Sequence, residues 1–277
     1  MSASTTALAA SGGAVPVVPE SSLHRLFWAV LDTLAMTKRN LIKYVRIPES
    51  LFFSSVQPVM FVLLFRYVFG GAIHVPGVSY VNYLIPGIFV QTVAFGAVAT
   101  SIALAEDLQK GIIERFRALP MARSAVLAGR TVADLVRNVV VVIIITGVGY
   151  AVGFRVQTNV LAFIAGLCLL LLFAYALSWA FAVIGLYAPN SETAQVMSFP
   201  LLFPLTFASS AFVPVKSMPG WLRGFAHYQP VSVVVDASRA LMLGGPTFSP
   251  VWQSIAWTVG IVVVLAPLAV RRYRQVT

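Results

Sequence analysis

The chain has 277 residues, of which 59% are hydrophobic and 10% are charged, and its mean hydropathy is +0.88. A soluble domain usually has about 25% charged residues, so the composition excludes an ordinary soluble protein and indicates an integral membrane protein. The formal net charge of +10 would also suit nucleic-acid binding. In so apolar a chain, basic loops that face anionic lipid head groups are the simpler interpretation.

The N-terminal part of the chain divides into two segments. Residues 1–22 have no basic start and no sustained apolar centre, which predicts a disordered cytoplasmic leader rather than a signal peptide. Over 23–46, apolar residues recur at helical spacing among basic and aromatic residues. This pattern predicts an amphipathic helix in the plane of the membrane surface. A helix packed on soluble protein is the alternative.

Long uncharged runs follow, beginning at Tyr67, Asn138, Val156, Thr193 and Ala240. Because backbone groups in lipid must form hydrogen bonds within their own segment, these runs predict helices, and the alternating pattern of a membrane barrel is absent. The predicted fold class is an all-α integral membrane protein with six transmembrane helices. We expect these spans near 50–70, 80–105, 127–153, 159–187, 194–213 and 251–270.

Some polar residues and prolines fall inside the expected spans. Pro200 and Pro204 predict a kinked or interrupted fifth span. Arg130, Asp134 and Arg137 are spaced by four and three residues, so they can pair along one face of the third span. We expect these three residues to lie at the membrane interface.

Residues 217–243, between the fifth and sixth spans, are moderately apolar but interrupted by proline and glycine. This favours a re-entrant helical hairpin that enters the membrane from the outside. Asp236 and Arg239 are three residues apart and are expected to pair, and Trp221 is expected to anchor the hairpin at the membrane interface. The residues singled out in this hairpin are Pro219, Trp221, Pro230, Asp236 and Arg239.

The basic residues set the expected orientation. Six spans place both termini on one side, and that side would contain 14 of the 19 Lys and Arg residues. Cytoplasmic segments carry the excess of Lys and Arg. The termini, including a tail over 271–277, are therefore expected in the cytoplasm.

The segment "EDLQKGIIERFRALPMAR", from Glu106 to Arg123, concentrates charge of both signs between two uncharged runs. Gly111 is expected to end or bend the second span there. A short amphipathic helix should follow, with its apolar stripe opposite the charges. An anionic membrane surface does not explain the carboxylates, whereas a protein partner uses both signs for register. We expect a docking helix, a loop on the head groups being the alternative.

Three motifs resemble the ABC-2 type transporter permeases, most closely the daunorubicin-resistance type. They are "LAEDLQKGIIERFRALPMARSAVLAGRTVADL", "QPVMFVLLFRYVFGGAI" and "FPLTFASSAFVPVKSMPGWLRGFAHYQPVSVVVDASRAL". The first is quite specific, and the other two corroborate it by order and spacing. The resemblance covers most of the chain from Leu23 onward. It implies a connecting helix over 23–46 and an ABC-2 transmembrane domain over 47–270.

The resemblance also implies partners. A coupling helix at about 110–119 would sit in a cleft of a separate ATP-binding subunit, with two such subunits and a second permease chain, identical or related, in the transporter. The chain has no G-x-x-x-x-G-K-[ST] phosphate loop, so we expect ATP and Mg on the partner, no cofactor here and no enzyme activity of its own. The coupling residues would be Glu106, Asp107, Lys110, Gly111, Glu114, Arg115, Phe116, Arg117, Leu119 and Pro120.

The implied activity is export of a hydrophobic or amphiphilic molecule (a drug, antibiotic, polyketide or lipid) across the cytoplasmic membrane. The route would be lined by the first, second and fifth spans at the interface of two permease chains, although ordinary helix packing explains each lining residue at least as well. The pathway residues are Gln57, Gln91, Thr92, Phe95, Ser198, Phe199 and Phe203.

Three alternatives stay open. The same fold could export a polysaccharide or lipid-linked glycan, but that would favour Tyr and Trp along the route, where Phe predominates. A passive channel would not need a docking helix of mixed charge. An intramembrane enzyme should show paired carboxylates or a nucleophile with its base, and we find neither pattern. His74 and His227 stand alone, so no metal site and no nucleic-acid partner are expected.

Overall fold

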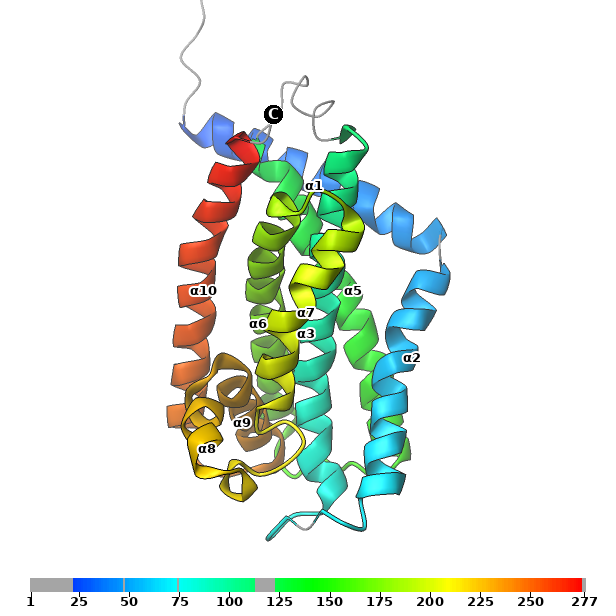
Figure 1. Ribbon diagram of the computed structural model, residues 1–277, viewed down its shortest axis with the longest axis vertical. Coiled ribbons are helices and arrows are strands. Elements are labelled where there is room, and N and C mark those ends of the chain that lie inside the picture. The colour runs from blue at the N-terminus through cyan, green and yellow to red at the C-terminus, as the bar shows by residue number, and fades with distance from the viewer. Residues whose placement is uncertain (1–21, 47, 74, 113–122, 276–277) are drawn as a thin grey trace, which may run out of the picture.

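The computed structural model describes residues 22–46, 48–73, 75–112 and 123–275, which contain helices and turns and no strand. Most helices stand side by side in a bundle, and α1 lies across one of its ends (Figure 1). The long helices are α1 (Ser22–Arg46), α2 (Pro48–Leu64), α3 (Tyr80–Gln109), α5 (Arg123–Ala151), α6 (Val160–Tyr187), α7 (Ser191–Phe207) and α10 (Phe248–Gln275). Shorter elements are the π-helical turn η1 (Phe65–Phe69), the 3₁₀ turn η2 (Val215–Ser217), α8 (Gly220–Tyr228) and α9 (Pro230–Leu243).

Within the described ranges, four helices are long and apolar enough to cross a bilayer: α3, α5, α6 and α10. The apolar stretch in α2 and η1, Ser54–Phe69, is shorter, and α7 has 17 residues. A helix needs about 20 apolar residues to span the hydrocarbon core. The chain is therefore an all-α, multi-pass membrane protein, and the count of six spans and the re-entrant hairpin stay predictions.

Side-chain caps explain where several helices begin. Ser79 accepts a hydrogen bond from the backbone of Asn82 before α3. Asn159 does the same before α6, and Asn190 before α7, each at 2.7 Å. Such caps satisfy backbone N–H groups that a first helical turn leaves unpaired. The helices thus start where short polar residues interrupt the apolar runs.

Helix α3 forms the centre of the bundle. It packs against α2, α5, α6, α7 and α9, and most of its residues from Tyr80 to Ala105 are buried. Residues such as Leu84, Ile88 and Phe89 have no exposed surface. Polar side chains in this stretch of α3 can therefore meet water only in cavities, or they must form hydrogen bonds to neighbouring helices.

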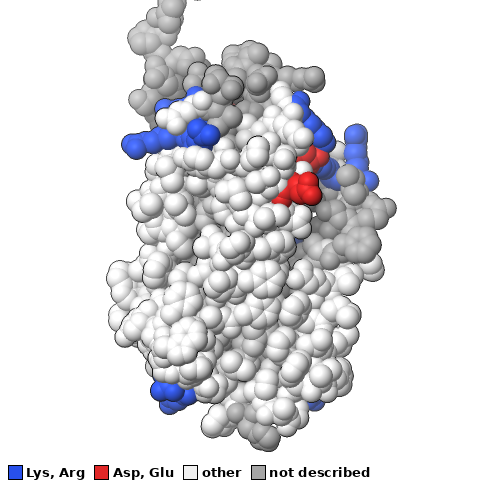
Figure 2. All heavy atoms as spheres, viewed as in Figure 1, with Lys and Arg blue, Asp and Glu red and all other residues white. Residues whose placement is uncertain are grey.

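Charge is distributed as a membrane location requires. On the face drawn in Figure 2, the middle of the molecule carries no Lys, Arg, Asp or Glu, and charged residues gather toward the two ends. The last turn of α10 lies at the same end of the bundle as α1 (Figure 1). Both carry basic residues there: Lys43 and Arg46 in α1, and Arg272 and Arg274 in α10.

Two helices end at other residues than the predicted spans. The fifth span was expected to reach 213, but α7 ends at Phe207. The backbone of Ser210 instead donates a hydrogen bond to the Ser232 hydroxyl of α9, at 3.0 Å, which holds this stretch as a turn. The tail was expected to begin at 271, but α10 continues to Gln275. Its last turns carry Arg272 and Arg274, which favour a helix C-terminus.

Helix α1 packs on α5 and α2 through a narrow face whose buried residues include Met36, Thr37 and Asn40. The apolar residues that define its amphipathic pattern point elsewhere. Trp28 and Leu34, for example, are 50% and 56% exposed. An exposed apolar helix face at the end of a membrane bundle is suited to lie against lipid.

Gly129 lets α1 approach α5 closely, so Gly129→Ala should lower the stability of the protein. A Cβ at Gly129 would lie 2.5 Å from the Met36 Cβ and 2.9 Å from the Thr33 carbonyl oxygen. Because one of these atoms is backbone, α1 must shift, at a cost of about 1–3 kcal/mol. Thermal unfolding in mild detergent measures the change.

The matched control is Gly147→Ala in the same helix. Nothing lies within 4 Å of a Cβ added there, so this change should be neutral or slightly stabilising, since Ala favours a helix over Gly. Equal effects of the two substitutions would contradict close packing of α1 at Gly129.

Candidate functional site

A cavity of about 130 Å³ lies between α2, α3 and α5. It brings together four of the predicted pathway residues: exposed Gln57 on α2, and Gln91, Thr92 and Phe95 on α3. These positions fall near the middle of their helices, so the cavity lies about midway along the bundle. The other lining residues are Ser54, Pro58, Phe61, Gly96, Ala99, Arg137, Asn138 and Val141.

The third wall of this cavity is α5, where the sequence had indicated the fifth span, α7. The α7 residues Ser198, Phe199 and Phe203 do not line it. Ser198 is fully buried, and its hydroxyl contacts that of Ser101 at 2.9 Å. α7 therefore does not line this cavity, and the expected cargo route along α7 stays a prediction. Residues 137 and 138 of α5 were missed because the spacing of Arg130, Asp134 and Arg137 pointed to the membrane interface.

A chain of phenylalanine rings runs from this cavity along α7 toward the opposite end of the bundle from α1. Phe95 meets Phe203 edge-on at 5.9 Å, and Phe203 stacks on Phe207 at 5.5 Å. Phe207 stacks on Phe212 at 5.4 Å, and Phe212 stacks on Phe65 at 4.5 Å. Such pairs contribute beyond their buried area. They form a continuous row of aromatic rings on this side of the protein.

A buried ionic cluster lies between α1, α3 and α5. Asp134 has no exposed surface. It accepts hydrogen bonds from the hydroxyls of Tyr44, at 2.7 Å, and Thr100, at 2.6 Å, and pairs with Arg130 at 3.3 Å. Burial, reinforced by the Asp134 carboxylate, raises the pKa of Tyr44 to about 12, so its hydroxyl stays a proton donor.

The predicted pairing of Arg130 with Asp134 is confirmed, and the expected location of these residues at the membrane interface stays a prediction. Arg130, Asp134 and Arg137 are all buried by protein. The spacing within α5 could not reveal this burial, because Tyr44 and Thr100, which complete the cluster, lie on other helices far away in the sequence. Helix α1 is therefore hydrogen-bonded to the core of the bundle.

A second cavity, of about 180 Å³, lies beside this cluster, nearer to α1. Arg137 and Ala99 border both cavities. A line of cationic side chains, Lys43, Arg130 and Arg137, thus leads from the end with α1 to the first cavity, between α2, α3 and α5 (the inner cavity). The remaining residues that line the second cavity are Tyr44, Ile102 and Ala103.

The end of α3 carries two carboxylates that reach back to α1. Glu106 lies 3.6 Å from Lys43 and also pairs with Lys110, and Asp107 lies 3.7 Å from Arg39. These partly exposed pairs are individually weak, but together they set the register of α1 on α3.

Gly111 follows with φ +63°, and its N–H bonds to the Leu108 carbonyl. A left-handed glycine after the last turn is a common helix ending, and the predicted break at Gly111 is confirmed. The other predicted coupling residues lie outside the described residues: Glu114, Arg115, Phe116, Arg117, Leu119 and Pro120.

Comparison with known proteins decides the family. A family model described as "ABC-2 type transporter" matches residues 32–243. This chain belongs to the ABC-2 type transporter family. The resemblance inferred from the sequence motifs is thereby confirmed.

Relatives of this ABC-2 protein extend over most of its length. It is 35% identical over 247 residues to the daunorubicin resistance ABC transporter permease protein DrrB1 of Streptomyces coeruleorubidus, which covers 89% of this chain and 87% of the relative. It is 29% identical over 256 residues to the probable doxorubicin resistance ABC transporter permease protein DrrC of Mycobacterium tuberculosis, with 91% of each chain covered. An inner membrane transport permease of Escherichia coli, YadH, is 25% identical over 231 residues, with 80% and 86% covered.

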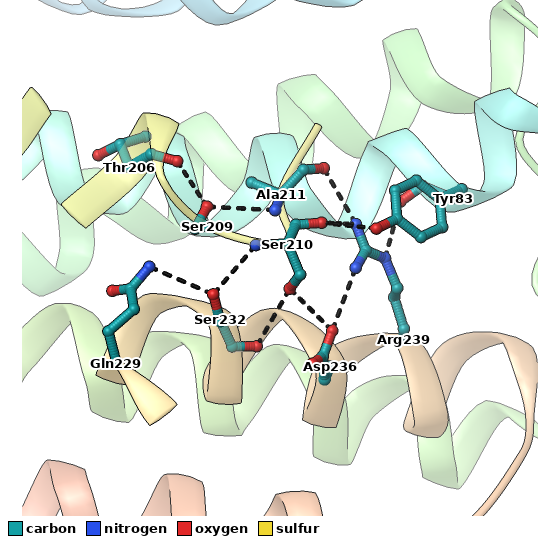
Figure 3. A network of polar contacts seen from close by, with 9 residues as sticks. All are labelled: Tyr83, Thr206, Ser209, Ser210, Ala211, Gln229, Ser232, Asp236 and Arg239. Atoms are coloured by element: carbon teal, nitrogen blue, oxygen red, sulfur yellow. Dashed lines mark hydrogen bonds and ion pairs between the residues drawn. The ribbon is translucent and has the colours of Figure 1, made fainter. Parts of the chain in front are cut away.

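At the end of this ABC-2 protein opposite α1, a polar network joins α9 to α3 and to the turn after α7 (Figure 3). The guanidinium of Arg239 donates to the carbonyl oxygens of Tyr83 (2.9 Å), Ser210 (2.6 Å) and Ala211 (3.0 Å). It lies 3.5 Å from the centre of the Tyr83 ring and pairs with Asp236 at 3.2 Å. The expected pair is present, and it belongs to a larger network that the sequence did not reveal.

The three other residues singled out in the predicted hairpin lie in or next to α8 and α9. Pro230 occupies the first turn of α9, where a missing N–H costs nothing, and Pro219 precedes α8. Trp221 on α8 is 81% exposed. The anchoring of Trp221 at a membrane interface stays a prediction.

Proposed function

We propose that this chain is the permease subunit of an ATP-driven ABC exporter that moves a hydrophobic or amphiphilic molecule out across the cytoplasmic membrane. The match to the ABC-2 family over residues 32–243 carries this proposal. The relatives named for daunorubicin and doxorubicin resistance support a drug, antibiotic, polyketide or lipid as cargo. Both termini would be cytoplasmic, as the basic residues predict.

A separate ATP-binding subunit supplies the energy in this proposal. The family implies such an ABC partner, and the sequence has no phosphate loop of its own. We propose two ATP-binding subunits, which hold ATP and Mg, and a second permease chain, identical or related. The segment at about 110–119 would dock on the partner, and the bond network of Tyr44 and Asp134 would make α1 move with α5.

The cargo route proposed here begins at the inner cavity. Gln57, Gln91 and Thr92 give it a few polar groups, and the phenylalanine rings from Phe95 onward give an apolar path. Ligand sites typically combine apolar walls with a few placed polar groups. The rings around this route are Phe rather than Tyr or Trp, which favours an apolar cargo over a glycan.

Extraction of the tagged chain from its own cells in mild detergent, followed by identification of what stays bound, tests this proposal. We expect a protein with a phosphate loop to co-purify. The double variant Glu114→Ala/Phe116→Ala should lose it, whereas Glu106→Gln should lose less, because Glu106 pairs with Lys43 and Lys110 within this chain.

The matched control is Trp221→Ala, at the opposite end of the bundle, which should retain the partner. If no ATP-binding protein accompanies the intact chain under conditions that preserve membrane complexes, the transporter proposal is wrong. If the partner survives the double variant, the docking contact lies elsewhere, and α1 is then the part to test.

A further inference from the structure

We infer that the inner cavity binds the anionic head group of an amphiphile, a phosphate or carboxylate, with Arg137 as its principal contact and Gln91 and Asn138 beside it. This inference rests on the proposed function and specifies the cargo class. Its first support is charge. Asp134 pairs with Arg130, and among the described residues no carboxylate lies within ion-pair distance of Arg137.

The cluster therefore holds two guanidinium groups for one carboxylate. Arg137 is 6% exposed and stands midway along α5, so its charge is buried inside a membrane helix bundle. Ionisable residues in such a place are costly and rare unless a partner or ligand compensates them. The surplus positive charge borders the cavity and would be compensated by a bound anion.

The second support is unpaired polar atoms. Both the amide nitrogen and the amide oxygen of Gln91 are buried without a hydrogen-bond partner in the described part of the chain, and so are the Asn138 amide nitrogen and the Arg137 Nε. Gln91 and Asn138 are each 3% exposed. Buried polar groups nearly always have partners, and these three side chains line one cavity. Their N–H groups form a set of donors suited to a head-group oxygen.

The third support is how Arg137 is held. Its Nη2 donates to the Gly96 carbonyl at 2.6 Å and to the Asn138 side-chain oxygen at 3.3 Å. A Cβ at Gly96 would lie 2.8 Å from that nitrogen. The glycine thus makes room for the guanidinium against α3, while Nε stays unpaired. A guanidinium that is fixed at one edge is preorganised for an anion at another.

The access route has the same charge. The second cavity, which shares Arg137 and Ala99 with the first, is bordered by Lys43 at the end with α1, and Lys43 is 49% exposed at its side chain. An anionic head group arriving from the cytoplasmic leaflet would pass Lys43 and Arg130 before it reaches Arg137. The apolar tail would face the rings around Phe61 and Phe95.

The test measures binding of a pyrene-labelled alkyl phosphate to the full chain in phosphatidylcholine nanodiscs. An alkyl trimethylammonium probe with the same tail is the control ligand. We expect the anionic probe to bind the intact chain and the cationic probe to bind at least tenfold more weakly. Arg137→Gln should weaken anion binding about tenfold or more, since hydrogen bonds to charged groups are strong. Arg137→Lys should restore part of that loss, and Arg271→Gln, on an exposed arginine of α10, should leave binding unchanged.

Gln91→Met separates a binding role from a structural one. Because the Gln91 amide has no partner, replacing it with an apolar side chain of similar size should raise the thermal midpoint by roughly 2–6 °C. Anion binding should nevertheless fall by about fivefold or more. This variant also keeps the inference testable if Arg137→Gln fails to fold.

Two sources of the head group are distinguished by adding phosphatidylglycerol to the nanodiscs. Competition with the probe identifies a membrane phospholipid as the occupant, and lack of competition identifies a soluble amphiphile. Equal binding of the two probes, or unchanged anion binding in folded Arg137→Gln and Gln91→Met, overturns the inference. Neither result bears on co-purification of the ATP-binding partner, so the two proposals fail separately.

Discussion

Replacing Asp134 with Ala is expected to lower the free energy of unfolding by about 3–5 kcal/mol, because it leaves a buried charge without its partner. The guanidinium of Arg130 would lose its carboxylate, and the hydroxyls of Tyr44 and Thr100 would lose their acceptor. With Arg137 nearby, the cluster would then hold two positive charges and no negative one. Thermal or denaturant unfolding in mild detergent measures the change.

A rescue variant makes this prediction specific. Substituting both members of a buried pair with apolar residues of similar volume is often close to neutral, so Arg130→Met with Asp134→Leu should be more stable than Asp134→Leu alone. A matched control is Glu192→Ala, on an exposed carboxylate in the first turn of α7, which should cost at most about 1 kcal/mol. A loss below about 1 kcal/mol for Asp134→Ala would show that the cluster does not hold α1 in place.

Replacing Arg239 with Ala is the second change expected to have a large effect, a loss of about 3 kcal/mol or more in the free energy of unfolding. One guanidinium serves three carbonyl oxygens of α3 and the turn after α7, and it also covers the Tyr83 ring (Figure 3). Its removal would leave these buried acceptors unpaired. Unfolding curves, together with the rate of limited proteolysis between α8 and α10, would report the loss.

Arg239→Lys should recover only part of this stability, since an ammonium group cannot reproduce the planar fork of five donors. The matched control is Arg223→Ala on α8. Arg223 also donates to two backbone carbonyls, at 3.1 Å, but one of these contacts is at the exposed surface, so the expected loss is within about 1 kcal/mol. Comparable losses at the two arginines would argue against a central role of the network in Figure 3.

The long helices could be predicted from the sequence because lipid restricts the possible structures. Four of the five uncharged runs correspond to α3, α5, α6 and α10, which are also the helices long and apolar enough to cross a bilayer. Gly111 could be predicted as a helix end because a local break requires only local information. The end of α7 could not, because it depends on Ser232 of α9, which lies 22 residues after Ser210.

The candidate site could be predicted in part. Gln57, Gln91, Thr92 and Phe95 were chosen as polar or aromatic residues within spans, and the structure places them around one cavity. The contribution of α5 could not be predicted, because a spacing of three or four shows which residues share a helix face but not which helix covers it. Asp134 illustrates this: Tyr44 is 90 residues away from it, and Thr100 is 34 residues away.

The two prolines of α7 have a mechanical consequence. Pro200 and Pro204 lie inside a helix that is continuous from Ser191 to Phe207, and each lacks the N–H that would bond the carbonyl four residues earlier. Bending α7 therefore breaks fewer backbone bonds than bending α6, which has no proline over its 28 residues. α7 carries Phe203, which lies against Phe95 at the cavity. The bundle thus pairs a stiff helix, α6, with a more easily bent one, α7, whose bending would move Phe203 relative to Phe95.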